Sequence, residues 1–250
     1  MKTIISGGVA LSLLTVSAFG ADLAVPSSFS APPSPPPFTW TSCYGGLHAG
    51  GGWGQKDLTD SAGILTTGTP GATANLGISG YILGGQFGCD YQFASNWVLG
   101  IEGAVSGGDI GGTINSTNIS TGGGDSTTFH ETTDFLGSVT GRVGFAWDRW
   151  LVYGKGGIAW AGDRYSALDA SQLYNYNGVE TRSGWTAGAG VEWALWKDWS
   201  VKLEYDYYGF GQGNVNFIDS TIGAPPGLEN IKQTVQVVQL GVNFHFVAGP

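Results

Sequence analysis

The clearest pattern in the chain is an alternation of apolar and polar positions near its C-terminal end. Within residues 236–246 the even positions become apolar, as at Leu240 and Phe244, while odd positions carry polar side chains such as Gln239 and Asn243. This period of two predicts a β-strand with one apolar and one polar face. The pattern recurs along the chain, and the connections between these segments alternate between short and long. It therefore favours a transmembrane β-barrel over a soluble sheet.

Eight segments of this kind predict eight strands, near residues 42–53, 79–92, 97–108, 133–147, 151–162, 184–196, 199–209 and 233–246. Three connections are tight turns, at 93–96, 148–149 and 197–198. The other four are long and rich in Gly, Ser, Thr and Asn, at 54–78, 109–132, 163–183 and 210–232. Outer-membrane barrels have short periplasmic turns and long outer loops. We therefore predict an all-β, eight-stranded antiparallel up-and-down transmembrane barrel with both termini in the periplasm.

The two faces of the predicted strands separate apolar from charged residues. The apolar face is predicted to meet lipid, for example at Leu83, Val139, Val143, Val201 and Leu240. The charged residues fall on the opposite face, close to the tight turns, and comprise Asp90, Glu102, Arg142, Lys155, Glu192, Lys202, Glu204 and Asp206. Eight strands enclose a lumen that side chains can just fill, and an unpaired buried charge is costly. These groups are therefore predicted to form one paired ionic layer in the lumen.

Composition supports the membrane interpretation. A soluble barrel with its charged face in water would normally carry more than the 12% of charged residues found here. Aromatic residues gather beside the tight turns, as an interfacial girdle requires; they are Tyr91, Phe93, Trp97, Trp147, Trp150, Trp193, Trp196 and Trp199. The 44 glycines leave room for large lumenal side chains. The formal charge of −9 argues against a nucleic-acid partner, which would require basic patches.

The first 38 residues do not resemble a barrel. An apolar stretch at residues 4–16 follows Lys2 and precedes Ala18 and Gly20. This is typical of a secretory signal peptide, residues 1–20, cleaved after Gly20. Residues 21–38 are rich in proline and are predicted to form a periplasmic linker. The barrel would occupy residues 39–250, and export would place it in the cell outer membrane of a Gram-negative bacterium.

The chain has two cysteines, Cys43 and Cys89. Export brings both into an oxidising compartment, where an even number of cysteines favours pairing. Both are predicted near the periplasmic ends of the first two strands and on the lipid-facing side. A disulfide between them is expected, and two free thiols that pack as small apolar residues are the alternative.

Several segments resemble the small outer-membrane β-barrel proteins of alpha-proteobacteria, which include outer-membrane immunogenic and haemin-binding proteins and are often called porin family. The segments lie at residues 38–53, 84–93, 98–103, 136–144 and 152–159. The resemblance implies a barrel like the transmembrane domain of OmpA that maintains envelope integrity and acts as a surface antigen. It also implies recognition of the C-terminal strand by the barrel assembly machinery, although residues 247–250 extend beyond the terminal aromatic Phe246.

Three classes of function follow. A structural, surface-exposed barrel without catalysis is favoured, and a narrow pore or haemin-binding protein is the alternative. Haemin would need axial ligands, for which His130, Tyr174 and Tyr176 in the long loops are the candidates. His48 and His245 are predicted to be lumenal hydrogen-bonding residues.

An enzyme is the third class. His130 has Ser126 and Asp134 nearby, but no G-x-S-x-G or H-E-x-x-H motif occurs, and we predict no catalytic residue and no metal site. No cofactor is predicted. The expected partners are outer-membrane lipid, lipopolysaccharide and the assembly machinery, with a homo-oligomer as a further option.

Overall fold

The computed structural model describes residues 38–60, 72–116, 127–169, 175–216, 218–219 and 228–248. These residues form strands joined by turns, and none of them forms a helix long and apolar enough to cross a membrane. The strands are β1 (Ser42–Asp60), β2 (Ala72–Gln92), β3 (Trp97–Ser116), β4 (Thr127–Trp147), β5 (Trp150–Asp169), β6 (Asn175–Ala194), β7 (Trp199–Asn216), the two-residue β8 (Ile218–Asp219) and β9 (Leu228–Ala248). The predicted signal peptide and nearly all of the linker lie outside the described residues.

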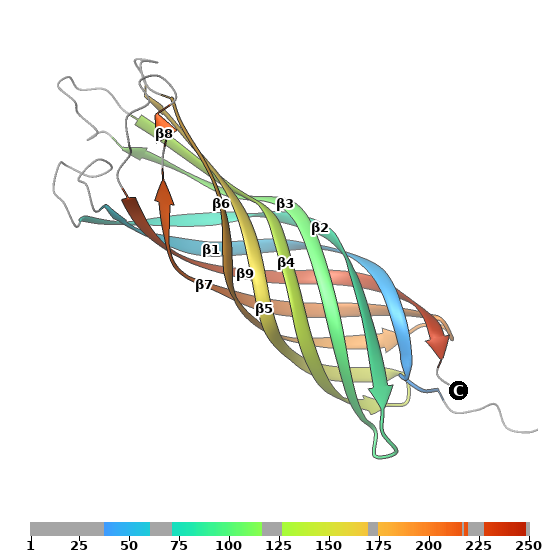
Figure 1. The fold of residues 1–250 in the computed structure, drawn as a ribbon. Coiled ribbons are helices and arrows are strands. Elements are labelled where there is room, and N and C mark those ends of the chain that lie inside the picture. The colour runs from blue at the N-terminus through green and yellow to red at the C-terminus, as the bar shows by residue number, and fades with distance from the viewer. Residues whose placement is uncertain are drawn as a thin grey trace, which may run out of the picture. The chain divides into compact units, whose positions relative to one another are not determined.

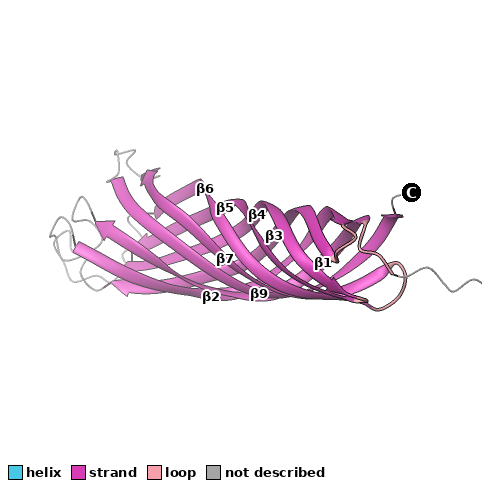
Figure 2. Cartoon of the chain, turned by 90° about the horizontal axis from the view of Figure 1, so that it is seen from below, coloured by secondary structure: helices cyan, strands magenta, loops and turns pink. Residues whose placement is uncertain are grey.

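Eight long strands close into one antiparallel barrel (Figure 1). Each pairs with its neighbour along the chain, β9 pairs with β1, and the β5–β6 ladder completes the ring. The turns after β2 and β4 contain Asn96 and Asp148, each with a positive φ, which these two residue types tolerate better than most. The predicted fold class is therefore confirmed, and Figure 2 shows the tilt of the strands around the barrel.

The strands are longer than the hydrophobic pattern predicted. β1 was expected to end at residue 53 and continues to Asp60, while β4 was expected from residue 133 and begins at Thr127. The predicted loops 54–78, 109–132, 163–183 and 210–232 are therefore wrong in extent, because much of each is strand. An apolar outer face is needed only within the bilayer. Above it, backbone pairing continues while outward side chains become polar, so the hydrophobic signal disappears before the strand ends.

Outward-facing residues mark the two membrane interfaces. Leu83 and Leu240 are about two-thirds exposed on the outer wall, and Val139 and Val143 face the same way, as predicted. All eight aromatic residues of the predicted inner girdle are exposed. A second, unpredicted ring lies on the outward face nearer the outer ends of the strands; it includes Trp53, Tyr81, Phe135 and Trp185. Aromatic belts at two heights are typical of a barrel that spans a bilayer.

Replacing Phe87 with arginine should lower the free energy of unfolding by about 2–4 kcal/mol. Phe87 is exposed on the outer wall about midway between Tyr81 and Tyr91 on β2, so a cation there would lie against hydrocarbon near the bilayer midplane. Asn75→Arg is the matched control, since Asn75 is exposed on the same strand beyond the outer aromatic ring. Urea unfolding in lipid vesicles measures both variants. Equal stability of the two would mean that the assignment of the lipid-facing wall is wrong.

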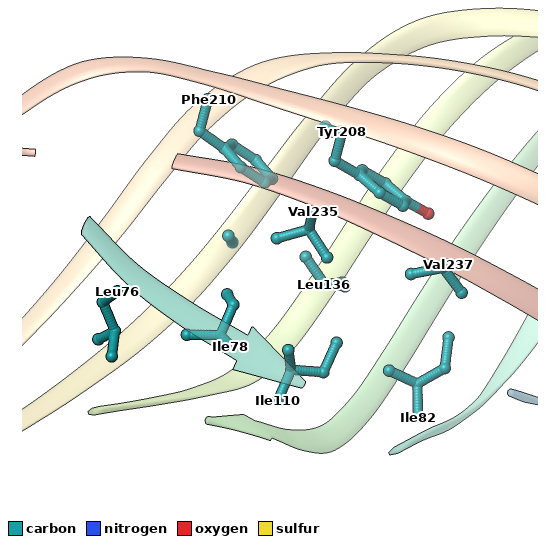
Figure 3. Close-up of a cluster of buried hydrophobic side chains, with 11 residues drawn as sticks. Leu76, Ile78, Ile82, Ile110, Leu136, Tyr208, Phe210, Val235 and Val237 are labelled. Carbon is teal, nitrogen blue, oxygen red and sulfur yellow. The ribbon is translucent and has the colours of Figure 1, made fainter. Parts of the chain in front are cut away.

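The lumen is filled by side chains in successive zones. At the periplasmic end Trp40 packs with Val98, Ala146, Leu151, Tyr153 and Ala194. The charged layer follows. Beyond it lies an apolar zone, shown in Figure 3, which comprises Leu76, Ile78, Ile82, Ile110, Leu136, Ala159, Ala161, Tyr208, Phe210, Val235 and Val237. A polar group around Asp163 lies nearest the outer ends of the strands. The sequence pattern did not predict the apolar zone, because lumenal positions were expected to be small or polar.

Candidate functional site

The centre of the charged layer is Arg142 on β4. Its guanidinium holds both carboxylate oxygens of Asp90, at 2.7 Å from Nε to Oδ1 and by a second contact from the terminal nitrogen. The carboxylate of Glu192, on β6, lies 3.3 Å from the same guanidinium. The rings of Tyr44 and Tyr153 lie on the guanidinium, each with its centroid 4.8 Å from Cζ. Arg142 is therefore held by charge and by two aromatic faces, which suits a buried cation.

Two lysines tie the same layer to β7. Lys155 lies 2.6 Å from Glu204, 3.3 Å from Glu102 and 3.2 Å from Asp206. Lys202 lies 3.0 Å from Glu102 and 3.4 Å from Glu204. The side chains in these contacts are at most 1% exposed. Glu102 and Glu204 thus each have two lysine partners. Asp206 has Lys155 and a hydrogen bond from Gln239 at 3.0 Å, and such partners offset the cost of burying a charge.

The tyrosines that hold Arg142 also join the two groups. Tyr44 donates to Glu102 at 2.9 Å, and Tyr153 donates to Glu204 at 2.6 Å. The guanidinium cluster and the lysine cluster therefore form one network across the lumen.

A chain of hydrogen bonds extends this network to the periplasmic end. The ring nitrogens of His245 lie 2.8 Å from the Ser42 hydroxyl and 2.9 Å from the Ser200 hydroxyl. Ser200 donates to Glu192 at 2.5 Å, and Asn243 donates to the same oxygen at 2.8 Å. Serine, histidine and glutamate meet here, but all are buried. These hydrogen bonds hold the carboxylate of Glu192 from the side opposite Arg142.

Trp40 closes the lumen below these residues. Its side chain is fully buried, and its ring lies 5.9 Å from the ring of His245. Its backbone N–H donates to the side chain of Gln92 at 2.8 Å, and the Gln92 N–H donates to Thr41 at 3.0 Å. The residues just before β1 are therefore fixed to the end of β2, so that Trp40 remains seated in the mouth. The sequence analysis missed this role because Trp40 precedes the first strand.

Glycines provide the space for the two tyrosines of the layer. A methyl group on Gly88 would collide with the hydroxyl of Tyr44, and one on Gly190 would collide with that of Tyr153. Each tyrosine thus lies directly against the backbone of a facing strand. The expected use of glycine to admit large lumenal side chains takes this form.

The polar group nearest the outer ends was not predicted. Asp163 lies 3.3 Å from Lys56 and 3.6 Å from Arg182, and it accepts a hydrogen bond from Thr133 at 2.6 Å. Arg182 also lies 2.8 Å from Glu180. Lys56, Asp163, Glu180 and Arg182 fell within the predicted loops, whereas Thr133 was expected at the start of a strand. Only a correct strand length would have placed Lys56, Asp163 and Arg182 on the lumenal face.

The structure thus brings together all eight residues predicted for the ionic layer: Asp90, Glu102, Arg142, Lys155, Glu192, Lys202, Glu204 and Asp206. His48 is also lumenal, 2.6 Å from Gln86 and 2.7 Å from Ser106. Tyr174 and the side chains of His130 and Tyr176 lie outside the described part of the chain, so the predicted haemin ligands stay predictions. Within that part, no group of three or more His, Cys, Asp or Glu residues could hold a metal ion.

Cys43 and Cys89 form a disulfide between β1 and β2, where the register places them directly opposite each other. The bridge lies near the periplasmic ends of both strands. It fixes β1 to β2 beside the point where β1 also meets β9.

We expect the mature protein to resist alkylation by iodoacetamide unless a reductant is added. The barrel after reduction and alkylation should unfold at a lower urea concentration, because the bridge closes a long segment of chain. Mass spectrometry under denaturing, non-reducing conditions measures the first result. Two alkylated cysteines without reductant would show that the bridge is absent.

Comparison with known proteins agrees with this geometry. Residues 23–246 match the family model described as outer membrane protein beta-barrel domain. The 31 kDa outer-membrane immunogenic protein of Brucella melitensis is 32% identical, over 98% of this chain and 100% of that protein. The 25 kDa outer-membrane immunogenic protein of Brucella abortus is 26% identical, over 98% and 99%.

Among solved structures, the outer membrane protease OmpT from Escherichia coli superimposes with a TM-score of 0.51 at 9% identity, covering 85% of this chain and 99% of the protease. OprG from Pseudomonas aeruginosa gives a TM-score of 0.43 at 13% identity, covering 81% and 97%. At such identities the likeness to OmpT concerns the fold alone.

Proposed function

Because the chain belongs to the outer membrane protein β-barrel family, we propose that it is a structural, surface-exposed barrel that contributes to envelope integrity and performs no catalysis. The observation that carries this proposal is the packed lumen. Its central layer is cross-linked by buried ion pairs through Arg142, Lys155 and Lys202. Trp40 closes one end of that layer and an apolar zone covers the other. These residues stabilise a rigid outer-membrane wall.

A narrow pore is the alternative, and the packing argues against it. Ions would have to displace the Arg142–Asp90 and Lys155–Glu204 pairs and then cross the apolar zone of Ile82 and Val237. An eight-stranded barrel has no spare width for a second path. The haemin-binding alternative depends on His130, Tyr174 and Tyr176 and gains no support from the described side chains.

We expect no steady conductance from the refolded protein in planar bilayers at neutral pH. An open porin refolded in the same way serves as the positive control for insertion. Ion steps that scale with protein concentration and persist after the Cys43–Cys89 bridge is verified would contradict the structural proposal and favour the pore.

The cellular role needs a separate test. Deletion of the gene should increase sensitivity to detergent and to large antibiotics, and the wild-type gene should restore the barrier. A triple variant, His130→Ala with Tyr174→Phe and Tyr176→Phe, should restore it equally if the role is structural. Failure of the triple variant despite normal levels in the outer membrane would favour ligand binding instead.

The proposed partners follow from the same location. Lipid contacts the apolar wall, and lipopolysaccharide contacts the outer aromatic ring near Trp53 and Trp185. The final strand, with Phe244 and Phe246 exposed on the outer wall, is proposed as the element that the barrel assembly machinery recognises. A homo-oligomer remains a further option for the lipid-facing wall.

A further inference from the structure

A polar amide lies among the aromatic residues of the outer ring where β9 meets β1. Gln236 on β9 is paired with Tyr207 of β7 on one side and with Trp53 of β1 on the other, so the three lie at one height on the outer wall. The hydroxyl of Tyr205 donates to the amide oxygen of Gln236 at 2.8 Å. Thr234 occupies the next outward position of β9. We call these five residues the seam patch.

The outward positions change character in order along these strands. Towards the middle of the membrane, Leu240 pairs with Leu203 of β7 and with Ala49 of β1, and all three are exposed. The uncharged seam patch follows. Beyond it, Lys232 and Asp57 are paired with each other and are the first charged residues on these outward positions. This order matches an amphiphile that has apolar chains and an uncharged polar headgroup at the level of the patch.

The wall beside Trp53 is bare backbone. A methyl group on Gly51, two residues nearer the membrane centre, would have the backbone oxygen of Gly80 as its nearest neighbour, at 3.8 Å. One on Gly77, which is paired with Gln55, would meet nothing within 4 Å. The side chain of Trp53 is 44% exposed. A flat ring can therefore reach it without displacing another side chain from these positions.

Recognition of a sugar ring uses the two kinds of contact that the seam patch offers. The faces of the ring consist largely of C–H groups, which pack on aromatic rings such as those of Trp53 and Tyr207. Its rim carries hydroxyls, which bond to amides and to other hydroxyls. Among the described residues, the amide nitrogen of Gln236 donates to none, so it can donate to a sugar. A phosphate headgroup would favour a cationic partner, and the patch contains none.

We propose that the seam patch binds the sugar headgroup of a glycolipid in the outer leaflet, whose acyl chains lie on Leu240 and Leu203. The occupant is a lipid and not a soluble sugar, because the apolar wall continues directly from the patch into the membrane. The proposal rests on the proposed contact with lipopolysaccharide. It goes further, because it names the sugar as the recognised part and places it on β7, β9 and β1.

The test uses the mature protein refolded in nanodiscs of phosphatidylcholine with a minor fraction of monogalactosyl diacylglycerol, a neutral lipid with a sugar headgroup. A second preparation contains the anionic phosphatidylglycerol in its place. Native mass spectrometry counts the lipids that remain on the released barrel. The galactolipid should be retained in preference to phosphatidylcholine, and phosphatidylglycerol should not. An equal or greater preference for phosphatidylglycerol overturns the proposal, because the wall would then recognise charge.

Variants of the outer wall locate the site. Gln236→Leu with Trp53→Leu should reduce the preference for the galactolipid by about fivefold or more, because it removes a hydrogen-bonding group and a stacking ring. Phe135→Leu is the matched control, since Phe135 is an exposed residue of the same outer ring on β4, and it should leave the preference unchanged. Equal retention by the two variants overturns the proposal.

Cross-linking of the wild type decides the matter even if the double variant fails to fold. A galactolipid with a photoreactive diazirine beside the sugar should label peptides of β1 and β9 around Trp53 and Gln236. Equal labelling around the whole outer ring, including the peptide of Phe135, overturns the proposal. A normal envelope barrier in the gene-deletion strain, together with labelling at the seam patch, would overturn the structural role alone.

Discussion

Replacing Arg142 with methionine is expected to lower the free energy of unfolding by about 3–5 kcal/mol, although methionine has a similar volume and is apolar. The loss comes from the carboxylates left behind. Glu192 keeps hydrogen bonds from Ser200 and Asn243, but Arg142 is the only hydrogen-bond donor to Asp90 among the described residues. Asp90 would thus be a buried charge without a counter-ion. The two tyrosine rings would also lose the cation between them.

Urea titration in vesicles, followed by the shift in gel mobility between folded and unfolded barrel, measures this effect. Arg149→Met is the matched control, because Arg149 is exposed in a turn, and it should change stability by less than about 0.5 kcal/mol. Adding Asp90→Asn to the Arg142→Met variant should recover part of the loss. A double-mutant cycle without coupling between Arg142 and Asp90 would remove the ionic layer as a source of stability.

Replacing Trp40 with alanine is expected to cost about 3–5 kcal/mol, because it leaves a cavity the size of an indole ring at the periplasmic mouth. The surrounding residues lie on four different strands and cannot easily collapse into that space. They include Val98, Leu151 and Ala194, which are each at most 1% exposed. The loss of Trp40 would also open a path for water towards His245 and Glu192.

Trp196→Ala is the control, since Trp196 lies in a turn and is 67% exposed. The same urea assay compares the two variants. If Trp40→Ala unfolds at the same urea concentration as the control, the residues before β1 are not a structural seal. Faster hydrogen exchange of β9 amides near His245 in the Trp40 variant would support the seal independently.

The sequence predicted the membrane half of the barrel well, because two physical constraints act there together. Lipid requires an apolar outer face, and charged side chains must lie on the opposite face, inside the closed lumen. The period of two is therefore strong at Leu83, Val139 and Arg142. The tight turns were also predictable from Asn96 and Asp148. The disulfide was predictable because Cys43 and Cys89 fall on the same face of neighbouring strands and at comparable heights in the barrel.

The rest depended on information that alternation does not carry. Above the outer aromatic ring the outward face can be polar, so Lys56 and Arg182 were assigned to loops although they are lumenal. Pairing within the charged layer also depends on shear between strands. Arg142 pairs with Glu192 at 3.3 Å and with Glu102 at 3.9 Å, but its bidentate partner is Asp90, which the facing of residues alone does not identify. Bulges, such as the one that shifts the register of the β7–β9 pairing between Phe210 and Gln212, also leave no mark in a periodic pattern.

The contacts between glycines and tyrosine hydroxyls determine how this lumen can change during evolution. A larger residue at Gly88 can enter only if Tyr44 becomes shorter, and the same holds for Gly190 and Tyr153. Either tyrosine, once shortened, also withdraws a ring from Arg142 and a donor from a glutamate. Substitutions inside the barrel should therefore arise as compensating sets across strands, whereas the lipid-facing wall can exchange one apolar residue at a time. Among descendants of this protein, the interior should record shared ancestry long after the outer wall has lost it.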